Sequence, residues 1–262
     1  MSDLTIHNLP NGIIYIENAF PESEKFLQEI DDSDNNPEIQ TVIPKWEPWQ
    51  DGYPVKKVLD DGTVIWEQVL DSDRGTVKSI DWDSSINSGN THWPRIDISP
   101  DYDEAHLKAY EILKKIDLPY QEMLKIWAEK TGNKYPSTWV TKNYTIRKYK
   151  TGGSMGSHVD KNIENPDNSM DWTALIYLND DYKGGKLAFD NLFIKLKPTA
   201  GSIIFFPCLE PHSVRKVKAG TKSYIFLFIH LDVGISTSLG EPYQELTKLI
   251  KEDRNSSGDL QS

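Results

Sequence analysis

Apolar residues follow two different patterns along this chain, and the pattern changes near residue 140. Between Ser99 and Gly132 they recur every three or four positions, as on one face of a helix. From Thr138 onward they form short runs separated by turn signals such as Gly152-Gly153 and Gly184-Gly185. This spacing is typical of an antiparallel sandwich or jelly roll. Eight short strands are expected, at residues 142–149, 155–160, 172–178, 186–189, 192–197, 202–207, 211–217 and 222–230.

The residues before this β-rich half predict further elements. A strand over 12–16 and a helix over 21–30 are expected first. The Asp61-Gly62 pair lies between two apolar runs, which predicts a β-hairpin. Two adjacent amphipathic helices follow between Ser99 and Gly132. We therefore predict an α+β, mainly β fold, with a jelly-roll core and helices packed on one face of a sheet.

Residues 1–250 are expected to form a single domain. Its N-terminal extension, residues 1–140, contains the first strand, a Trp-rich region and the two helices, and residues 141–231 form the jelly-roll core. Five tryptophans between residues 46 and 93 are expected to pack in the core or to anchor loops rather than to stack on a ligand. A last short helix is predicted over 242–250, and residues 251–262 are predicted to be a mobile tail.

Charge and composition narrow the range of functions. The 262-residue chain has a net charge of −11, from 29 basic and 40 acidic residues, which argues against sequence-independent binding to nucleic acid. Its single cysteine, Cys208, fits a reducing compartment. We see no signal-peptide pattern and no apolar run of membrane-spanning length. We therefore expect no nucleic-acid partner, no membrane association, and a cytoplasmic location in a bacterial or virus-infected cell.

The first candidate for chemistry is the pair His158 and Asp160. Residues two positions apart on a strand point to the same face, so the imidazole and the carboxylate would lie side by side. A nitrogen and an oxygen ligand together suit Fe(II). A His-Asp hydrogen bond at a turn is the alternative interpretation of this motif.

His212 is the candidate third ligand. It follows an apolar strand and a loop, and in a jelly roll it would face the first pair across the mouth of the barrel. Two histidines and one carboxylate leave about three coordination positions open, as in non-haem iron oxygenases. The same triad is also compatible with zinc, and a lone histidine after a proline is often a surface turn residue.

Lys222 lies ten positions after His212, at the start of an apolar strand. A charged side chain that turns inward there needs a partner of opposite charge. A dicarboxylate cosubstrate would supply one and would favour the oxygenase over the zinc interpretation. The alternative is a lysine whose ammonium group reaches solvent from the strand end.

Residues 144–230 resemble the prolyl 4-hydroxylase type of 2-oxoglutarate- and Fe(II)-dependent dioxygenase. The order and spacing of the motifs agree over about a third of the chain. The matching pieces are Tyr149 before a Gly-rich loop, His158-x-Asp160, Thr173-Ala-Leu-Ile-Tyr-Leu-Asn179, Gly184-Gly185-Lys-Leu-Ala-Phe189, Gly201-Ser-Ile-Ile-Phe-Phe206, and His212-x-Val-x-x-Val-x-x-Gly-x-Lys222.

The resemblance implies a double-stranded β-helix core and a set of site residues. His158, Asp160 and His212 would ligate Fe(II), and Lys222 would pair with the distal carboxylate of 2-oxoglutarate. Tyr177 matches a position whose hydroxyl helps to bind that carboxylate, and Tyr149 matches an aromatic residue of the cosubstrate pocket; core packing is the alternative for both. The cosubstrates would be 2-oxoglutarate and O2, with ascorbate as a further expected cofactor, and succinate and CO2 as products.

The residues do not identify the substrate. By analogy we expect a peptide, a protein or a small molecule to be hydroxylated at an unactivated C–H bond, with peptidyl proline or an amino acid first. A non-catalytic jelly-roll binding module, and a cupin-like zinc or manganese enzyme, are the alternatives from other functional classes. The pattern does not determine the oligomeric state.

Overall fold

The computed structural model describes residues 3–40, 42–48, 52–58, 64–70, 75–81, 104–133, 143–160 and 171–229. Every strand pair in these ranges is antiparallel. No helix among them is long and apolar enough to cross a membrane. The expected helix over 242–250 and the expected tail over 251–262 lie outside the described residues.

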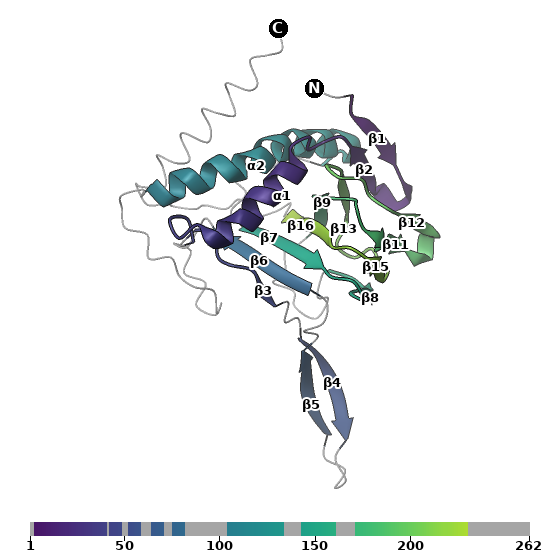
Figure 1. The fold of residues 1–262 in the computed structure, drawn as a ribbon. Coiled ribbons are helices and arrows are strands. Elements are labelled where there is room, and N and C mark those ends of the chain that lie inside the picture. Colours follow the sequence, from purple (N-terminus) through teal and green to yellow (C-terminus); the bar gives the residue numbers. More distant parts are fainter. Residues whose placement is uncertain are drawn as a thin grey trace, which may run out of the picture.

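An eight-stranded sheet forms the centre of the molecule (Figure 1). Its strands lie in the order β1-β2-β13-β9-β16-β7-β6-β3, so strands far apart in the sequence become neighbours. Their bounds are β1 Thr5–Asn8, β2 Ile14–Glu17, β3 Glu47–Pro48, β6 Gly75–Asp81, β7 Asn143–Tyr149, β9 Trp172–Tyr177, β13 Ile203–Pro207 and β16 Lys222–Ile229.

A four-stranded sheet packs on one face of this large sheet. Its order is β12-β11-β14-β8, with β8 at Met155–His158, β11 at Leu187–Phe189, β12 at Ile194–Leu196 and β14 at His212–Val214. Apolar residues of both sheets form one buried cluster, in which Ile204 and Phe206 of β13 meet Leu187 and Phe189 of β11. The predicted packing of antiparallel sheets around a core is therefore confirmed.

Two helices cover the opposite face of the large sheet (Figure 1). They are α1, Ser23–Asp32, and α2, Glu104–Thr131, and together with the sheet they bury a second apolar cluster. Because side chains alternate along a strand, Ile203 and Phe205 join this cluster while Ile204 and Phe206 join the other. The Phe205 ring centroid lies 6.2 Å from that of Trp127 on α2.

The expected pair of helices between residues 99 and 132 is wrong for the described part, because α2 is one continuous helix of 28 residues. Pro119 lies inside it, where a proline removes one backbone hydrogen bond and normally ends or kinks a helix. The buried positions Ile116 and Tyr120 lie on either side of it and are both 0 % exposed. Packing of the same apolar face before and after Pro119 therefore keeps the helix in one piece.

Short elements complete the described chain. The predicted hairpin is confirmed as β4, Gly52–Val58, paired with β5, Val64–Leu70, while its Asp61-Gly62 turn lies outside the described residues. Figure 1 shows this hairpin standing away from the two sheets. The strands β10, Lys183–Gly184, and β15, Val217–Ala219, form a separate pair, and short 3-10 turns occur at η1 Pro10–Gly12, η2 Ser33–Asn35 and η3 Asp190–Leu192.

Candidate metal centre and an adjoining lysine pocket

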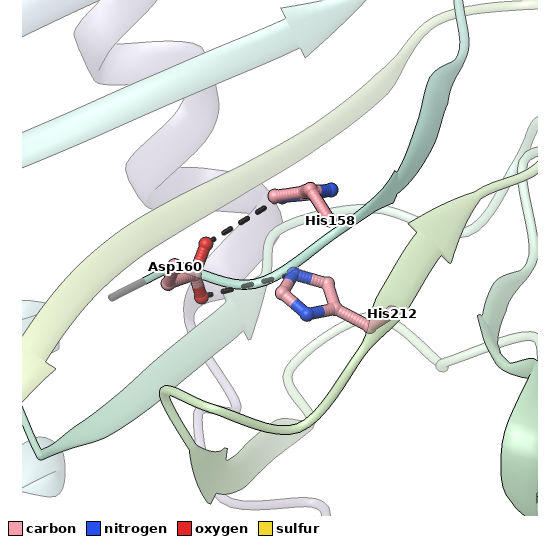
Figure 2. Close-up of side chains that lie close together, drawn as sticks. All are labelled: His158, Asp160 and His212. Carbon is pink, nitrogen blue, oxygen red and sulfur yellow. Dashed lines mark ion pairs between the residues drawn. The ribbon is translucent and has the colours of Figure 1, made fainter. Parts of the chain in front are cut away.

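The strands β8 and β14 of the four-stranded sheet bring His158, Asp160 and His212 together (Figure 2). His158 ends β8 and His212 begins β14, and the two residues face each other as partners in this antiparallel pair. Asp160 follows two positions after His158. The nearest ligand atoms of all three side chains lie within 4.8 Å of one another, so the cluster expected from the sequence exists in the fold.

Both imidazoles point their Nε2 atoms toward the Asp160 carboxylate (Figure 2). The His158 Nε2 lies 3.5 Å from Oδ1, and the His212 Nε2 lies 3.7 Å from Oδ2. Two nitrogens and one carboxylate on one side of a common point form a facial donor set. These distances suit ligands that surround one ion from the same side.

Backbone carbonyls hold the other nitrogen of each ring. His158 Nδ1 lies 2.9 Å from the Gly156 carbonyl oxygen, and His212 Nδ1 lies 3.0 Å from the Glu210 carbonyl oxygen. A carbonyl only accepts, so Nδ1 carries the proton and the Nε2 lone pair is left for a metal. Such outer contacts fix both the tautomer and the orientation of a ligating histidine.

Asp160 is held by two residues, Thr173 and Cys208, to which the sequence motifs assigned no role at the site. The Thr173 hydroxyl donates to Asp160 Oδ2 over 2.6 Å, and the Asp160 amide donates to the Cys208 carbonyl over 2.9 Å. Thr173 is completely buried in β9. In the sequence, Thr173 is visible only as a threonine at the start of an apolar strand. That pattern does not indicate which group its hydroxyl contacts.

The protonation of the triad follows from these contacts. Burial opposes the charge on Asp160, yet its hydrogen bonds and the two imidazoles hold the pKa of its carboxyl below the usual value. Burial also lowers the pKa of His212. For His158 burial acts in the same direction, but the hydrogen bonds with Asp160 and Gly156 outweigh it and raise the pKa. An ionised carboxylate beside a neutral His212 is the state that binds a cation.

Lys222, at the start of β16, points into the aromatic cluster between the two sheets and is 1 % exposed. Among the described residues its Nζ has one hydrogen bond, 2.8 Å to the Gly185 carbonyl oxygen. No carboxylate of the described residues forms an ion pair with it. Burial without a counter-ion lowers the pKa of Lys222 to about 7. The alternative in which its ammonium group reaches solvent is therefore wrong.

Four tyrosine rings surround the Lys222 ammonium group. The Nζ atom lies 5.1 Å from the ring centroid of Tyr177 and 5.9 Å from that of Tyr149, the two tyrosines named from the sequence. Tyr182 and Tyr224 lie at 6.0 and 5.8 Å and were not predicted. The buried Tyr182 hydroxyl has no hydrogen-bond partner among the described residues. The Lys222 ammonium group, with its single acceptor, and the Tyr182 hydroxyl could therefore both donate to a bound carboxylate.

Aromatic side chains connect the lysine pocket with the triad. The Phe206 ring centroid lies 4.6 Å from that of His212, and the Phe189 centroid lies 6.2 Å from it. Both phenylalanines belong to the same buried cluster as Tyr149, Tyr177 and Tyr224. The triad and the lysine therefore border one apolar interior between the two sheets, which shields Lys222, Asp160 and His212 from water, while the His158 side chain is 31 % exposed.

A separate cavity of about 580 Å³ lies on the other side of β16. It is lined by residues of α1, β6, β7, β16 and nearby loops: Leu27, Asp31, Gly75, Thr76, Lys148, Lys150, Asn179, Thr221 and Ser223. Neither the triad nor Lys222 is among them. Because Lys222 and Ser223 point to opposite faces of the strand, this cavity is not the candidate site.

Residues 144–230 match the family model of the 2OG-Fe(II) oxygenase superfamily. The resemblance inferred from the sequence is confirmed over this stretch. The curated relatives include a PKHD-type hydroxylase of Prochlorococcus marinus (strain NATL1A), 40 % identical over 75 residues, which are 27 % of this chain and 34 % of that protein. Human prolyl 3-hydroxylase 2 is 35 % identical over 69 residues, 24 % of this chain and 10 % of that protein.

The matched regions are therefore short: this chain spans about a third of the length of the Prochlorococcus relative. Solved structures with a similar arrangement include a prolyl hydroxylase from Trichoplax adhaerens in complex with a hypoxia inducible factor peptide fragment, 16 % identical with a TM-score of 0.48 and 85 % of each chain covered. A Pseudomonas putida prolyl-4-hydroxylase is 15 % identical with a TM-score of 0.46, covering 84 % of this chain and 94 % of that one.

Proposed function

We propose that this protein is a 2-oxoglutarate- and Fe(II)-dependent hydroxylase. The observation that carries the proposal is the joint placement of an His-Asp-His cluster and a buried lysine around one aromatic interior. A buried ammonium group next to the triad favours this function over a zinc hydrolase or a simple binding module, because it supplies a counter-charge for a dicarboxylate cosubstrate. The superfamily match over residues 144–230 supports the same conclusion.

His158, Asp160 and His212 would hold the iron, and Lys222 would bind the distal carboxylate of 2-oxoglutarate. Tyr177 and Tyr149 would line that pocket, as the sequence suggested. The Tyr182 hydroxyl, which has no hydrogen-bond partner in the described part of the chain, is suited to donate to the same carboxylate. Once bound, iron and 2-oxoglutarate supply the activation of O2, with succinate and CO2 as products. Nothing in the described residues supports a role for ascorbate.

The protein's own contribution is positioning and exclusion of water. The Gly156 and Glu210 carbonyls orient the two imidazoles, and Thr173 orients the Asp160 carboxylate. The aromatic cluster keeps water away from the Lys222 ammonium group, which strengthens its attraction for a bound carboxylate. We assign no general base, because no step of the proposed hydroxylation requires the protein to remove a proton.

The two facing sheets support a double-stranded β-helix as the catalytic core. We propose that residues 141–231 form this core within a single domain of residues 1–250, with residues 1–140 as an extension that provides α1, α2 and the outer strands. The hairpin β4–β5 belongs to that extension. A cytoplasmic location remains our prediction.

For the substrate we propose a peptidyl proline or an amino acid. The matched relatives include proteins named PKHD-type hydroxylase and prolyl 3-hydroxylase 2, which favours a peptide. The test is a comparison of proline-containing peptides with free amino acids in the presence of Fe(II), 2-oxoglutarate and O2. We expect succinate formation to rise with the true substrate and the product to gain one oxygen atom by mass. Metal binding without any 2-oxoglutarate turnover would refute the proposal.

A further inference from the structure

The loop that connects β13 with β14 touches two of the three residues of the candidate metal centre. The Cys208 carbonyl accepts the Asp160 amide over 2.9 Å. The Glu210 carbonyl lies 3.0 Å from His212 Nδ1. A displacement of this short loop would therefore move the backbone of Asp160 and the ring of His212 at the same time.

The Glu210 side chain ties this loop to two distant parts of the chain. Its Oε2 accepts from Asn11 Nδ2 over 2.9 Å, and its Oε1 accepts from Asn191 Nδ2 over 2.7 Å. Glu210 is only 7 % exposed. Both oxygens of the carboxylate are thus used by neutral amides, one from the η1 turn and one from the η3 turn.

The positions of the η1 and η3 turns place Asn11 and Asn191 within hydrogen-bond distance of Glu210. Asn11 has a left-handed backbone, with φ of 58°, which asparagine tolerates better than most residues. The η1 turn precedes β2, which pairs with β13 directly before the loop. The η3 turn also holds β14 on the other side of His212, where Asp190 accepts from Ser213 over 3.4 Å and from the Arg215 guanidinium.

We propose that Glu210 is a positioning residue for the metal centre, and that Asn11 and Asn191 act through it. The Asn11–Glu210–Asn191 bridge holds the Glu210 carbonyl where it fixes the His212 tautomer and ring orientation. It also holds the Cys208 carbonyl where it fixes the Asp160 backbone. This inference rests on the proposed metal role of the triad and assigns to the N-terminal segment a share in metal affinity.

The test measures Co(II) binding to the full-length protein by calorimetry, with Co(II) as a stable stand-in for Fe(II). We expect Asn11→Gly, which keeps the left-handed backbone but removes the amide, to weaken Co(II) binding about tenfold. Glu210→Gln is expected to weaken Co(II) binding as well. The glutamine has only one acceptor oxygen, so the NH2 group of either Asn11 or Asn191 then faces another NH2 group and loses its hydrogen bond. Asn18→Gly is the matched control, since Asn18 has φ of 60° and donates to the Asp3 carbonyl instead.

A double variant that exchanges the amide and the carboxylate distinguishes a positioning role of Glu210 from a general loss of stability. In the double variant Asn11→Asp with Glu210→Gln, the amide and carboxylate change places, so the bond between positions 11 and 210 forms again with the donor reversed. We expect this variant to recover most of the Co(II) affinity that each single change loses. The unfolding midpoint of the metal-free protein is measured alongside and is expected to change no more in Asn11→Gly than in Asn18→Gly.

The outcomes distinguish this inference from the proposed function. Wild-type affinity that depends on His212 but is unchanged in Asn11→Gly and Glu210→Gln overturns the positioning role and leaves the hydroxylase proposal standing. The positioning role is also overturned if the double variant does not recover Co(II) affinity, or if Asn18→Gly loses as much Co(II) affinity as Asn11→Gly. Weaker Co(II) binding in the variants of a protein that turns over no 2-oxoglutarate supports the bridge and contradicts the hydroxylase. Wild-type protein that binds no Co(II) contradicts both.

Discussion

At the scale of single residues, Lys222 is buried as a charge without a counter-ion among the described residues, which opposes folding of the ligand-free protein. A lysine with a pKa of about 7 instead of 10.5 has lost much of the hydration that favours its charge. Four tyrosine rings and one carbonyl replace only part of that hydration. Buried ionisable groups with strongly shifted pKa values cluster at functional sites.

We therefore predict that Lys222→Met stabilises the metal-free protein by about 1–4 kcal/mol while it weakens 2-oxoglutarate binding. The folded protein binds the Lys222 proton only below about pH 7, and the unfolded chain binds it up to about pH 10.5. Wild-type stability should then rise with pH between these values, so the advantage of Lys222→Met should be largest below pH 7.

Urea unfolding of the two proteins at several pH values measures this difference. Lys195→Met, at an exposed position of β12, is the control for a lysine that is not buried. A variant at position 222 that is less stable than wild type at acidic pH would show that the buried ammonium group stabilises the fold.

The same group predicts the pH dependence of cosubstrate binding. The 2-oxoglutarate carboxylate binds the protonated lysine, so affinity should fall as pH rises through about 7, where Lys222 loses its proton. The slope should approach about tenfold per pH unit, and it should be missing in Lys222→Met. Equilibrium titration of 2-oxoglutarate into the metal-loaded protein checks this, and an affinity that is constant above neutral pH would argue against Lys222 as the anchor.

Thr173 offers a further test at the residue scale. Thr173→Val keeps the shape of the side chain but removes the hydroxyl that donates to Asp160. We expect metal affinity to fall about tenfold, because the carboxylate loses the contact that orients it. Calorimetric titration with Co(II) measures the effect, with Thr131→Val at the end of α2 as the control. Equal affinity in Thr173→Val and wild type would show that the Thr173 hydroxyl does not orient the Asp160 carboxylate for the metal.

At the scale of secondary structure elements, the sequence predicts the strands of the core well and the helices less well. Alternating apolar residues in β9, β13 and β16 mark one side for the helices and the other for the aromatic interior. The expected strand over 211–217 is divided into β14 and β15, because the first pairs with β8 and β11 and the second pairs with β10. The continuity of α2 was missed because Pro119 opposes it locally and only tertiary packing supports it.

Because Pro119 opposes the helix that tertiary packing supports, a single substitution at this position should stabilise the protein. We predict that Pro119→Ala restores the missing backbone hydrogen bond and raises the free energy of unfolding by about 1–3 kcal/mol. Urea unfolding measures the change. A loss of stability would show that the proline ring is needed in the packing of α2 or that it restricts the unfolded chain to advantage.

At the scale of the whole molecule, the candidate site depends on contacts between segments that are far apart in the sequence. The motifs were sufficient to name His158, Asp160, His212 and Lys222 because their order and spacing resemble those of a known family. Strand periodicity alone was not the reason, since the expected strand over 155–160 ends at His158 and Asp160 lies beyond β8. They were not sufficient for Thr173, Glu210 or Tyr182. The roles of these residues arise only when two sheets and two turns meet, which no local pattern in the chain records.

The most direct test of the whole account is an anaerobic spectrum. Fe(II) and then 2-oxoglutarate are added to the protein, and the visible metal-to-ligand charge-transfer band of the joint complex is recorded. We predict this band for the wild-type protein, its loss in His212→Ala and its weakening in Lys222→Met. Folded wild-type protein that binds Fe(II) but shows no band with 2-oxoglutarate would contradict the claim that the triad and Lys222 form one oxygenase site.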